Sequence, residues 1–465
     1  MTASAWEGKA GPAMVPEAGN WEHGGPGMGS AGRRLTAEDL SILALETDMV
    51  AGHACKVLLL GGGLDLGQLR SSISERLHRA PGLSMCLREV GGEPWWVPDP
   101  QVDVTDHVVA SDAAEAVDEA GFRAAAAGIF EQRLDRSRPL WRIDVIPQLA
   151  GGGSALIWRI HHALADGSTA MRMANAVLWD SVPGGEPGAV RSVTRPKSPI
   201  SGGPVPRHRL GRLRTAAREA PQPWRRSPFD GHIDARRAVA FATTSLAELR
   251  LVAGATDGAT VNDAVLAVVA GGLRRWLEAR HGHLGSVRVK VPVSLHDLSV
   301  TQGDDGSQLG NRDSFFCLDL PLGSTDPVER LAAIGRATRV RKQDHDAQHI
   351  DALMRELAAA PRLRRFAESV LAHPRSFALN VSNVRGPRQP VHVLGVPVRA
   401  LYSLAEIRER HALRIAVVSL ADTLNFGLVA DPTLLGDVDQ LASGMQAEAA
   451  ALTARVPPAT STAPR

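Results

Sequence analysis

The chain has few of the residues that mark secreted, metal-binding or nucleic-acid-binding proteins. Its 465 residues include only three cysteines, Cys55, Cys86 and Cys317, and they stand far apart. Isolated cysteines favour a reducing compartment, and no histidines or cysteines are spaced as a zinc site requires, so we expect no metal. An excess of charge of one sign is also missing. The formal net charge of +2 gives no reason to expect a nucleic acid partner.

Long hydrophobic runs are absent as well. No stretch approaches the ~18 consecutive apolar residues of a membrane-spanning helix. The first residues do not combine the basic, apolar and small-residue regions of a secretory signal. We therefore expect a cytoplasmic protein that meets the inner face of the cell membrane or a lipid droplet only peripherally. With 44% hydrophobic residues, the chain can still bury a large core, and its length suggests two or three domains.

Composition divides the chain into five parts. Residues 1–33 are rich in Gly, Pro, Ala and Glu without periodicity, so we expect a disordered leader, and residues 456–465 predict a disordered tail. Residues 184–237 form a linker rich in Arg, Pro and Gly between domains at 34–183 and 238–455. The linker arginines have two interpretations. They bind phosphates or anionic lipid, or they belong to a solvated connection.

Hydrophobic periodicity predicts mixed α/β structure on both sides of the linker. In the first domain it predicts helices over 36–47, 65–79, 113–134 and 168–180, and strands over 53–60 and 155–160. In the second domain it predicts helices over 244–255, 261–280, 327–343, 348–372 and 435–453, and strands over 287–291, 314–320, 376–382, 391–395, 412–419 and 423–430.

Two histidines and an aspartate lie close together at a predicted strand-to-helix corner, in His161-His162-Ala163-Leu164-Ala165-Asp166-Gly167. Neutral imidazole titrates near pH ~6.5 and can take a proton from an alcohol at cellular pH. Successive strand side chains point to opposite faces, so only one of the two histidines can face a given cavity. We choose His162 as the general base and give His161 a supporting role.

The rest of the motif has both functional and structural interpretations. Asp166 either orients the imidazole or holds the loop by pairing with an arginine. Gly167 allows backbone torsions that a Cβ would forbid. A structural alternative covers the whole motif, namely a packed histidine pair followed by an ordinary Asp-Gly turn. The motif alone therefore indicates a poised base without proving one.

Other segments, taken in order, make the chain resemble the bacterial wax ester synthase/acyl-CoA:diacylglycerol acyltransferase family. This family is part of the CoA-dependent acyltransferases with a His-His-x-x-x-Asp-Gly motif, and the resemblance runs from about Leu35 to Leu452. The His motif alone is also typical of polyketide-associated acyltransferases and peptide-synthetase condensation domains. The segments that narrow it are Leu35-Thr36-Ala37-Glu38-Asp39, Leu45-Glu46-Thr47, Pro94-Trp95-Trp96-Val97, Leu134-Asp135-Arg136-Ser137-Arg138-Pro139-Leu140-Trp141, Thr260-Val261-Asn262-Asp263, Val291-Pro292-Val293-Ser294, Gly310-Asn311, Ser382-Asn383-Val384-Arg385-Gly386-Pro387 and Phe426-Gly427-Leu428-Val429-Ala430-Asp431.

The resemblance implies a fold, a reaction and partners. The expected fold has two chloramphenicol-acetyltransferase-like domains, whose mixed sheets are flanked by helices and enclose an interdomain tunnel. The expected reaction moves a fatty acyl group from acyl-CoA, which is a substrate, to diacylglycerol or a long-chain alcohol, and needs no cofactor. The products would be triacylglycerol or wax ester. Two alternatives stay open: a carrier-protein-dependent condensation enzyme of natural-product assembly, and a silent lipid-binding homologue.

The same segments suggest further site residues, and each of these residues has both a functional and a structural interpretation. Pro139, Leu140 and Trp141 contact substrate or simply start a packed strand. Asn262 and Asp263 cap a helix, or Asn262 supports the wall of the active site or hydrogen-bonds the developing oxyanion.

Ser382 and Asn383 end a strand or, as the resemblance implies, line the channel and donate to the thioester oxygen. Three segments depart from the family pattern, so they leave the acceptor open: Ser227-Pro228-Phe229-Asp230, Arg385 and Val418-Ser419-Leu420.

Overall fold

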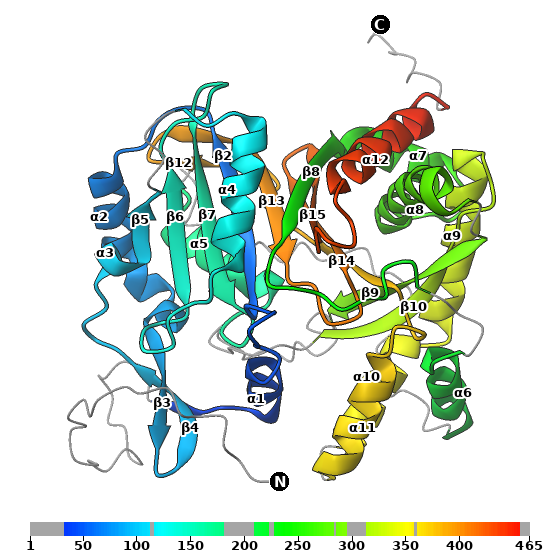
Figure 1. The fold of residues 1–465 in the computed structure, drawn as a ribbon, viewed down its shortest axis with the longest axis horizontal. Coiled ribbons are helices and arrows are strands. Elements are labelled where there is room, and N and C mark those ends of the chain that lie inside the picture. The colour runs from blue at the N-terminus through cyan, green and yellow to red at the C-terminus, as the bar shows by residue number, and fades with distance from the viewer. Residues whose placement is uncertain are drawn as a thin grey trace, which may run out of the picture.

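The computed structural model describes residues 32–111, 116–180, 209–222, 227–282, 285–294, 313–357 and 360–455. The predicted tail, most of the predicted leader and most of the linker lie outside these ranges. The described elements form two halves that lie side by side, each built on a six-stranded mixed sheet with flanking helices (Figure 1). The predicted mixed α/β architecture is therefore confirmed, whereas the interdomain tunnel stays a prediction.

The first sheet has the strand order β12-β13-β2-β7-β6-β5, and all its pairs are antiparallel except β5 with β6. Two of its strands come from late in the chain, so the segment 34–183 does not complete this sheet alone. Its strands are β2 (His53–Leu60), β5 (Val108–Ala110), β6 (Trp141–Ile146), β7 (Ser154–His161), β12 (His392–Val393) and β13 (Val396–Ala405).

Helices and a small hairpin sheet surround the first sheet. The helices are α1 (Ala37–Leu43), α2 (Leu66–Arg76), α3 (Val104–His107), α4 (Glu119–Glu131) and α5 (Gly167–Val177), with 3-10 turns at Leu77–Arg79 and Pro81–Ser84. A three-stranded sheet in the order β1-β4-β3 consists of β1 (Arg33–Arg34), β3 (Met85–Val90) and β4 (Glu93–Pro98). Arg33, the last residue of the predicted leader, is therefore part of a strand.

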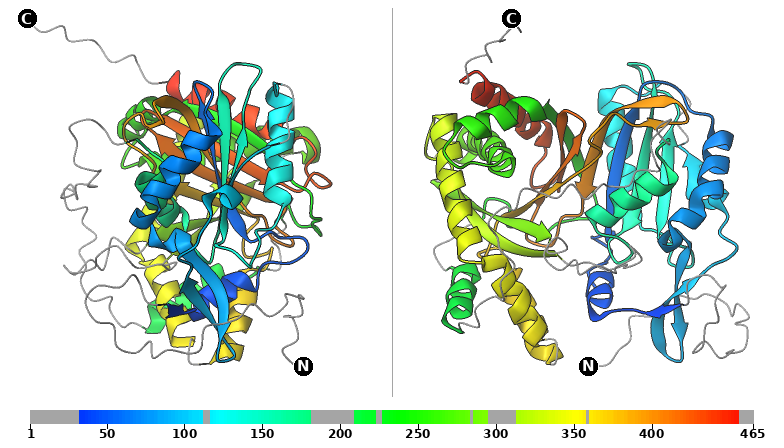
Figure 2. Two further views of the ribbon diagram at one scale, coloured as in Figure 1. Left: turned by 90° about the vertical axis from the view of Figure 1, so that its left-hand side faces the viewer. Right: turned by 180° about the vertical axis from the view of Figure 1, so that it is seen from behind.

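The second sheet has the order β10-β9-β11-β14-β15-β8, and β11 runs parallel to both of its neighbours. Its strands are β8 (Ala238–Ser245), β9 (Ser286–Ser294), β10 (Asp313–Pro321), β11 (Leu379–Val384), β14 (Leu413–Leu420) and β15 (Thr423–Ala430). Four helices cover one face, α7 (Leu246–Ala255), α8 (Val261–His281), α9 (Pro327–Gln343) and α12 (Val438–Thr453) (Figures 1 and 2). Three more lie at one end, α6 (Arg209–Glu219), α10 (Asp346–Glu356) and α11 (Pro361–Leu371).

Besides a second apolar cluster that lies mainly in the first half, one continuous apolar core spans both halves. It runs from Val57 and Phe130 in the first half to Leu266 and Val417 in the second. The sheets also approach closely at β13 and β15. A Cβ added to Gly427 would lie only 2.1 Å from the backbone oxygen of Ser403, so this position requires glycine. This shared core holds the two sheets in one arrangement.

The helices expected over 348–372 are α10 and α11, and Pro361 begins the second of them because proline cannot continue a helix. The strands that were not predicted include β3, β4, β5, β8 and β13. The longest of these is β13. It contains Pro397 and an irregular register between Val398 and Ala400, both of which weaken a period-2 pattern.

Candidate active site

The motif singled out in the sequence does lie at a strand-to-helix corner. Strand β7 ends at His161 and helix α5 begins at Gly167. Asp166 is the N-cap residue of α5, and its carboxylate accepts hydrogen bonds from the Thr169 backbone N–H at 2.6 Å and the Ser168 hydroxyl at 2.9 Å. The aspartate is therefore committed to the loop and the helix N-terminus. This geometry supports a loop-organising role for Asp166.

His161 is buried and its hydrogen bonds assign its tautomer. The Ala163 backbone N–H donates to Nδ1 at 3.1 Å, so the ring proton is on Nε2, which donates to the Glu46 carboxylate at 3.1 Å. Arg136 also donates to Glu46, at 3.0 Å. Burial favours the neutral acid, but the hydrogen bonds from His161 and Arg136 hold the pKa of Glu46 below its usual value. His161 is thus fixed as a structural partner of a carboxylate.

Gly52 connects the two histidines through its backbone. Its carbonyl accepts a hydrogen bond from the His162 backbone N–H at 3.1 Å. Its φ of 74° lies in the left-handed region, and a Cβ there would lie 2.8 Å from Nε2 of His161. Only glycine fits both constraints. The sequence prediction missed Gly52, because its partner lies more than a hundred residues away.

His162 has a free nitrogen. Its side chain is half-buried, and Nε2 is shielded from solvent and has no hydrogen-bond partner among the described residues. Burial and the positive charges of Arg414, Arg408 and Lys56 lower its pKa well below 6.5. The imidazole is therefore neutral at pH 7 and can accept a proton. His161, by contrast, has both ring nitrogens engaged.

Lys56 is a buried cation near the same loop. It lies on β2, and its ammonium donates to the Ser403 hydroxyl at 2.9 Å. Burial lowers the pKa of Lys56 to about 8, while the charge of Asp166 favours the protonated form. The lysine therefore supplies positive charge beneath α5. Its signal in the sequence was a single cation within the apolar strand 53–60.

The Pro-Leu-Trp segment supports the motif from the neighbouring strand. The carbonyl of Leu140 accepts the backbone N–H of His161 at 3.0 Å. The buried indole of Trp141 donates to the Leu83 carbonyl at 2.7 Å and stacks on His107 with 4.4 Å between ring centroids. Pro139 immediately precedes this pair. The structure thus favours the packed strand start over contact with substrate.

Two other predicted segments meet at the start of α8. The Asn383 amide donates to the Asn262 side-chain oxygen at 3.4 Å. Thr260 is the N-cap of α8, and Asp263 completes its capping box and accepts the Thr338 hydroxyl at 2.6 Å. Asp263 therefore has the capping role proposed from the sequence, whereas Asn262 is not the N-cap. The wall role predicted for Asn262 stays a prediction.

One face of the second sheet lies toward the His162 loop. A Cβ at Gly167 would be 2.9 Å from a methyl group of Val384 at the end of β11, so these two positions are in contact. Side chains alternate along a strand, so Ser382 lies on the same face as Val384 and Asn383 on the opposite one. Of this predicted pair, Ser382 is therefore the residue directed toward the loop.

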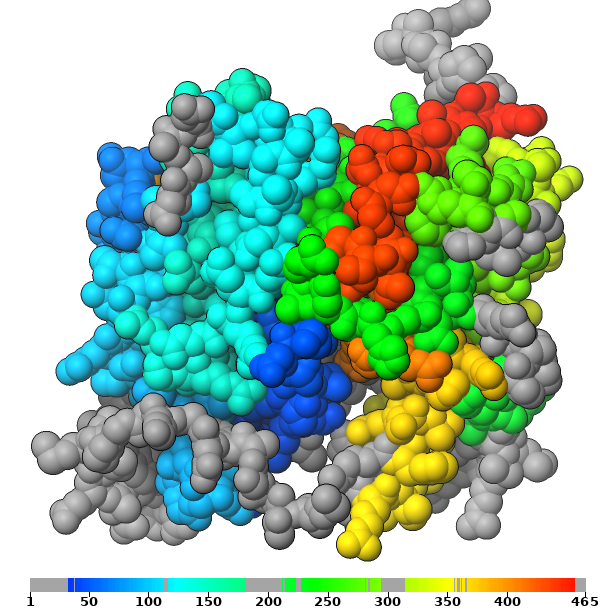
Figure 3. Space-filling model, viewed as in Figure 1, coloured from blue at the N-terminus to red at the C-terminus, as the bar shows by residue number. Residues whose placement is uncertain are grey.

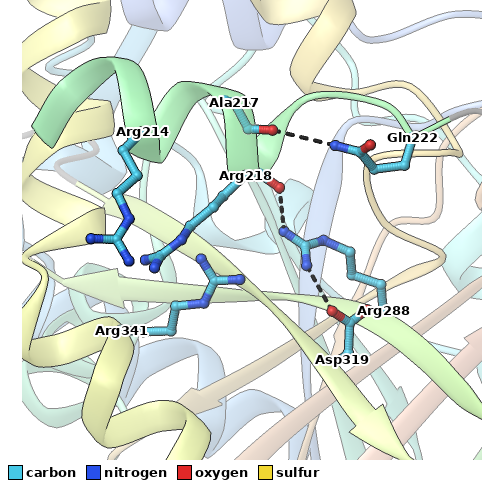
Figure 4. A pocket seen from close by; sticks show the side chains of 7 residues that line it. All are labelled: Arg214, Ala217, Arg218, Gln222, Arg288, Asp319 and Arg341. Atoms are coloured by element: carbon cyan, nitrogen blue, oxygen red, sulfur yellow. Dashed lines mark hydrogen bonds and ion pairs between the residues drawn. The ribbon is translucent and has the colours of Figure 1, made fainter. Parts of the chain in front are cut away.

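The linker contributes a docked helix rather than a solvated one. Glu219 of α6 is fully buried and accepts from Arg288 at 3.2 Å and Arg341 at 3.3 Å, while Arg218 pairs with Asp346 at 3.5 Å. Figure 4 shows the resulting pocket of about 420 Å³, lined by Arg214, Ala217, Arg218, Gln222, Arg288, Asp319 and Arg341. Three of its four arginines are ion-paired, so the solvated interpretation is wrong for α6.

Within the described ranges, no three His, Cys, Asp or Glu side chains converge as a metal site requires, and the three cysteines are free thiols. None of the described helices combines the length and the apolar character needed to cross a membrane.

Comparison with known families agrees with this geometry. Residues 35–202 match the model of the wax ester synthase/diacylglycerol acyltransferase catalytic domain, and residues 309–453 match the model of the WS/DGAT C-terminal domain. The chain belongs to the wax ester synthase/diacylglycerol acyltransferase family. The catalytic model includes the whole His motif, and the C-terminal model includes β11, β14 and β15.

Individual relatives extend over most of the chain. A Mycobacterium tuberculosis protein, provisionally named a diacylglycerol O-acyltransferase, is 29% identical over 459 residues, which is 89% of this chain and 96% of the relative. A Mycobacterium bovis protein with the same kind of name is 28% identical over 480 residues, which is 90% of this chain and 93% of the relative. These WS/DGAT relatives match both halves of the chain.

Solved structures show the same fold. The wax ester synthase/diacylglycerol acyltransferase from Marinobacter aquaeolei superimposes with a TM-score of 0.67 at 23% identity, over 90% of this chain and 98% of that one. The first condensation domain of the CDA synthetase gives a TM-score of 0.54 at 17% identity, over 91% and 98%. The WS/DGAT fold is thus shared with condensation domains.

Proposed function

We propose that the protein transfers a fatty acyl group from acyl-CoA to the hydroxyl of a diacylglycerol or a long-chain alcohol, forming triacylglycerol or wax ester. The observation that carries this proposal is the unpartnered Nε2 of His162, in a motif where both ring nitrogens of His161 and Oδ1 of Asp166 make hydrogen bonds. Membership of the acyltransferase family supplies the reaction class.

The chemistry requires one base. Nε2 of His162 takes the hydroxyl proton as the alcohol oxygen attacks the thioester carbonyl, and the tetrahedral oxyanion collapses with cleavage of the C–S bond. The proton then goes to the departing CoA thiolate. A positioned general base contributes about 10²–10⁴-fold to such a step. We assign Ser382 as the donor to the oxyanion, because it lies on the face of β11 toward the His162 loop.

The chemistry of the two substrates indicates what else the reaction needs. Thioesters are already activated, so we propose that the reaction needs no cofactor and no covalent enzyme intermediate. We further propose a tunnel between the two sheets, with acyl-CoA and acceptor entering from opposite sides and the base midway. Holding both lipids end to end supplies much of the rate enhancement.

Product analysis tests this function. Radiolabelled palmitoyl-CoA is offered with hexadecanol, monoacylglycerol and diacylglycerol, and the products are separated by thin-layer chromatography. We expect labelled ester with at least one acceptor. Transfer from an acyl carrier protein but not from acyl-CoA would instead favour the condensation-type alternative, and lipid that co-purifies without turnover would favour the silent homologue.

We also propose peripheral contact with an anionic membrane or lipid-droplet surface. Six of the nine exposed large apolar side chains of the described residues lie on or next to α1, the β3–β4 hairpin and α11, and these elements project toward one end of the molecule (Figures 2 and 3). Phe366 and Leu363 on α11 are 69% and 58% exposed. That helix has three arginines and one glutamate in its sequence, which suits anionic lipid.

Vesicle co-sedimentation tests the membrane contact. We expect binding to vesicles of phosphatidylcholine with phosphatidylglycerol, stronger than to phosphatidylcholine alone and weaker at high salt. The double substitution Leu363→Ser/Phe366→Ser should weaken partitioning at least about tenfold. Leu251→Ser on α7, which is 55% exposed elsewhere, is the matched control. Equal binding by both variants would refute this surface.

A further inference from the structure

The short segment 49–52, which precedes β2, is held by two side chains from much later in the chain. The backbone N–H of Ala51 donates to Oε2 of Glu406 at 3.2 Å, and Glu406 stands 355 positions after Ala51, directly behind β13. The backbone carbonyl of Met49 accepts a hydrogen bond from the guanidinium of Arg237, which directly precedes β8. Strands β13 and β8 lie along the boundary between the two halves (Figure 1).

The two side chains form a buried ion pair. Nε of Arg237 donates to Oε1 of Glu406 at 2.8 Å, and the two side chains are only 1% and 6% exposed. Burial raises the pKa of Glu406, whereas the charge of Arg237 favours the carboxylate. Removing the charge of one partner leaves the other charge buried without compensation. The carboxylate that holds Ala51 therefore depends on Arg237.

Arg237 is itself anchored on several sides. Its backbone N–H donates to the side chain of Glu131, the last residue of α4, at 2.7 Å. Its Nη1 donates to the backbone carbonyls of Asp234 and Arg236 at 2.6 Å and 2.7 Å. The guanidinium has thus one fixed orientation. The Arg237–Glu406 pair can therefore impose a fixed position on the segment 49–52.

The held segment leads directly to the base. Ala51 precedes Gly52, whose carbonyl accepts the backbone N–H of His162 at 3.1 Å. Ala51 is 5% exposed, so solvent cannot easily replace Glu406 as the acceptor of its N–H. Without that acceptor the segment has to move, and the carbonyl of Gly52 moves with it. A displacement of about 1 Å at a catalytic group can cost about 10²-fold in rate.

We propose that Glu406 and Arg237 are positioning residues for the general base, which they hold in place through the backbone of the segment 49–52. This inference rests on the proposed acyl transfer with His162 as its base. Neither side chain takes part in the proton transfer. Together they set where Nε2 of His162 lies, so loss of the pair should slow the chemical step and leave substrate binding largely unchanged.

The substitution Glu406→Gln tests the inference. It keeps the shape of the side chain, but an NH₂ group replaces one of the two carboxylate oxygens, so either the Ala51 N–H or Arg237 faces another donor. We expect kcat to fall about 10–10²-fold, while KM for palmitoyl-CoA and for the acceptor changes by less than about threefold. Arg237→Met should act in the same way. Arg237→Lys keeps the buried charge and should retain more of kcat than Arg237→Met.

Glu448→Gln is the matched control. Glu448 of α12 accepts from Arg330 of α9 at 2.8 Å, and these side chains are 3% and 1% exposed, so the pair is equally buried. It lies among the helices that cover the second sheet, apart from the segment 49–52. Glu448→Gln should lower the midpoint of urea unfolding, as Glu406→Gln does, but leave kcat unchanged. An equal loss of kcat in the two variants would overturn the inference.

The decisive measurement adds Glu406→Gln to His162→Ala. Once the base is absent there is nothing left to position, so the double variant should keep the residual kcat of His162→Ala within about twofold. A further loss of about tenfold would overturn the inference, because the pair would then act by another route. Arg237→Lys carries the same comparison if Glu406→Gln does not fold. Wild-type turnover by His162→Ala alone would instead overturn the proposed base, and the inference with it.

Discussion

Replacing Gly52 by alanine probes how the two histidines are held. The new Cβ would lie 2.8 Å from Nε2 of His161 and 3.3 Å from the Glu46 side chain, at a φ of 74°. A left-handed conformation costs an L-residue about 1–2 kcal/mol, and overpacking adds about 1–3 kcal/mol. We therefore expect Gly52→Ala to lower the free energy of unfolding by about 2–5 kcal/mol.

The same change should slow catalysis. The Gly52 carbonyl holds the His162 backbone N–H at 3.1 Å, so movement of the glycine shifts the base. A displacement of about 1 Å can cost about 10²-fold in rate. We expect kcat to fall by this order, with a smaller change in KM, because the proposed tunnel for the substrate chains does not depend on Gly52.

The substitution Gly92→Ala is a control that separates the cost of backbone strain from the cost of the steric clash at Gly52. The φ of Gly92 is 80°, yet a Cβ there would have no neighbour within 4 Å. Gly92→Ala should therefore cost only the backbone term of about 1–2 kcal/mol and leave kcat unchanged. The assays are urea unfolding and turnover of palmitoyl-CoA with hexadecanol. Equal effects of the two substitutions on stability and rate would refute the argument.

Three further predictions follow from the site. Glu46→Ala removes the acceptor of His161 and Arg136 and should cost about 2–3 kcal/mol in urea unfolding; a change below about 0.5 kcal/mol would contradict the network. Trp141→Phe leaves the Leu83 carbonyl without its donor and should cost about 1–3 kcal/mol, measured the same way, with kcat less affected than by Gly52→Ala. Burial lowers the folded-state pKa of His53 and His162 well below 6.5, so the unfolded chain binds protons that the folded chain does not. Stability should therefore fall as the pH drops below about 6.5, by up to about 1.4 kcal/mol per pH unit for each histidine, and the acid limb of kcat/KM should lie below pH 6.5. A stability independent of pH between 6.5 and 5 would contradict this.

Much of the fold was predictable because local patterns were strong. The strand 53–60 and the helix 327–343 have the predicted bounds, since an uninterrupted apolar run and an Asp-Pro start mark them clearly. Strand β13 was not predicted, because Pro397 and the irregular register between Val398 and Ala400 weaken its period-2 pattern. The crossing of β12 and β13 into the first sheet is a tertiary feature, and the domain boundaries at 183 and 238 stay predictions.

The residues of the site also fall into a group that the sequence predicted and a group that it did not. The corner at His161 to Gly167 was visible in the sequence, because strand, turn and helix signals adjoin there. The roles of Glu46 and Gly52 depend on contacts across the first sheet and could not be assigned from spacing.

The most direct test of the account is the turnover of His162→Ala with palmitoyl-CoA and the best acceptor from the product panel. His232→Ala is the control, because that side chain is 96% exposed and pairs only with Glu409 among the described residues. We predict that His162→Ala loses about 10²–10⁴-fold in kcat while it unfolds at the same urea concentration as the control. Wild-type turnover by His162→Ala would contradict the assignment of the base.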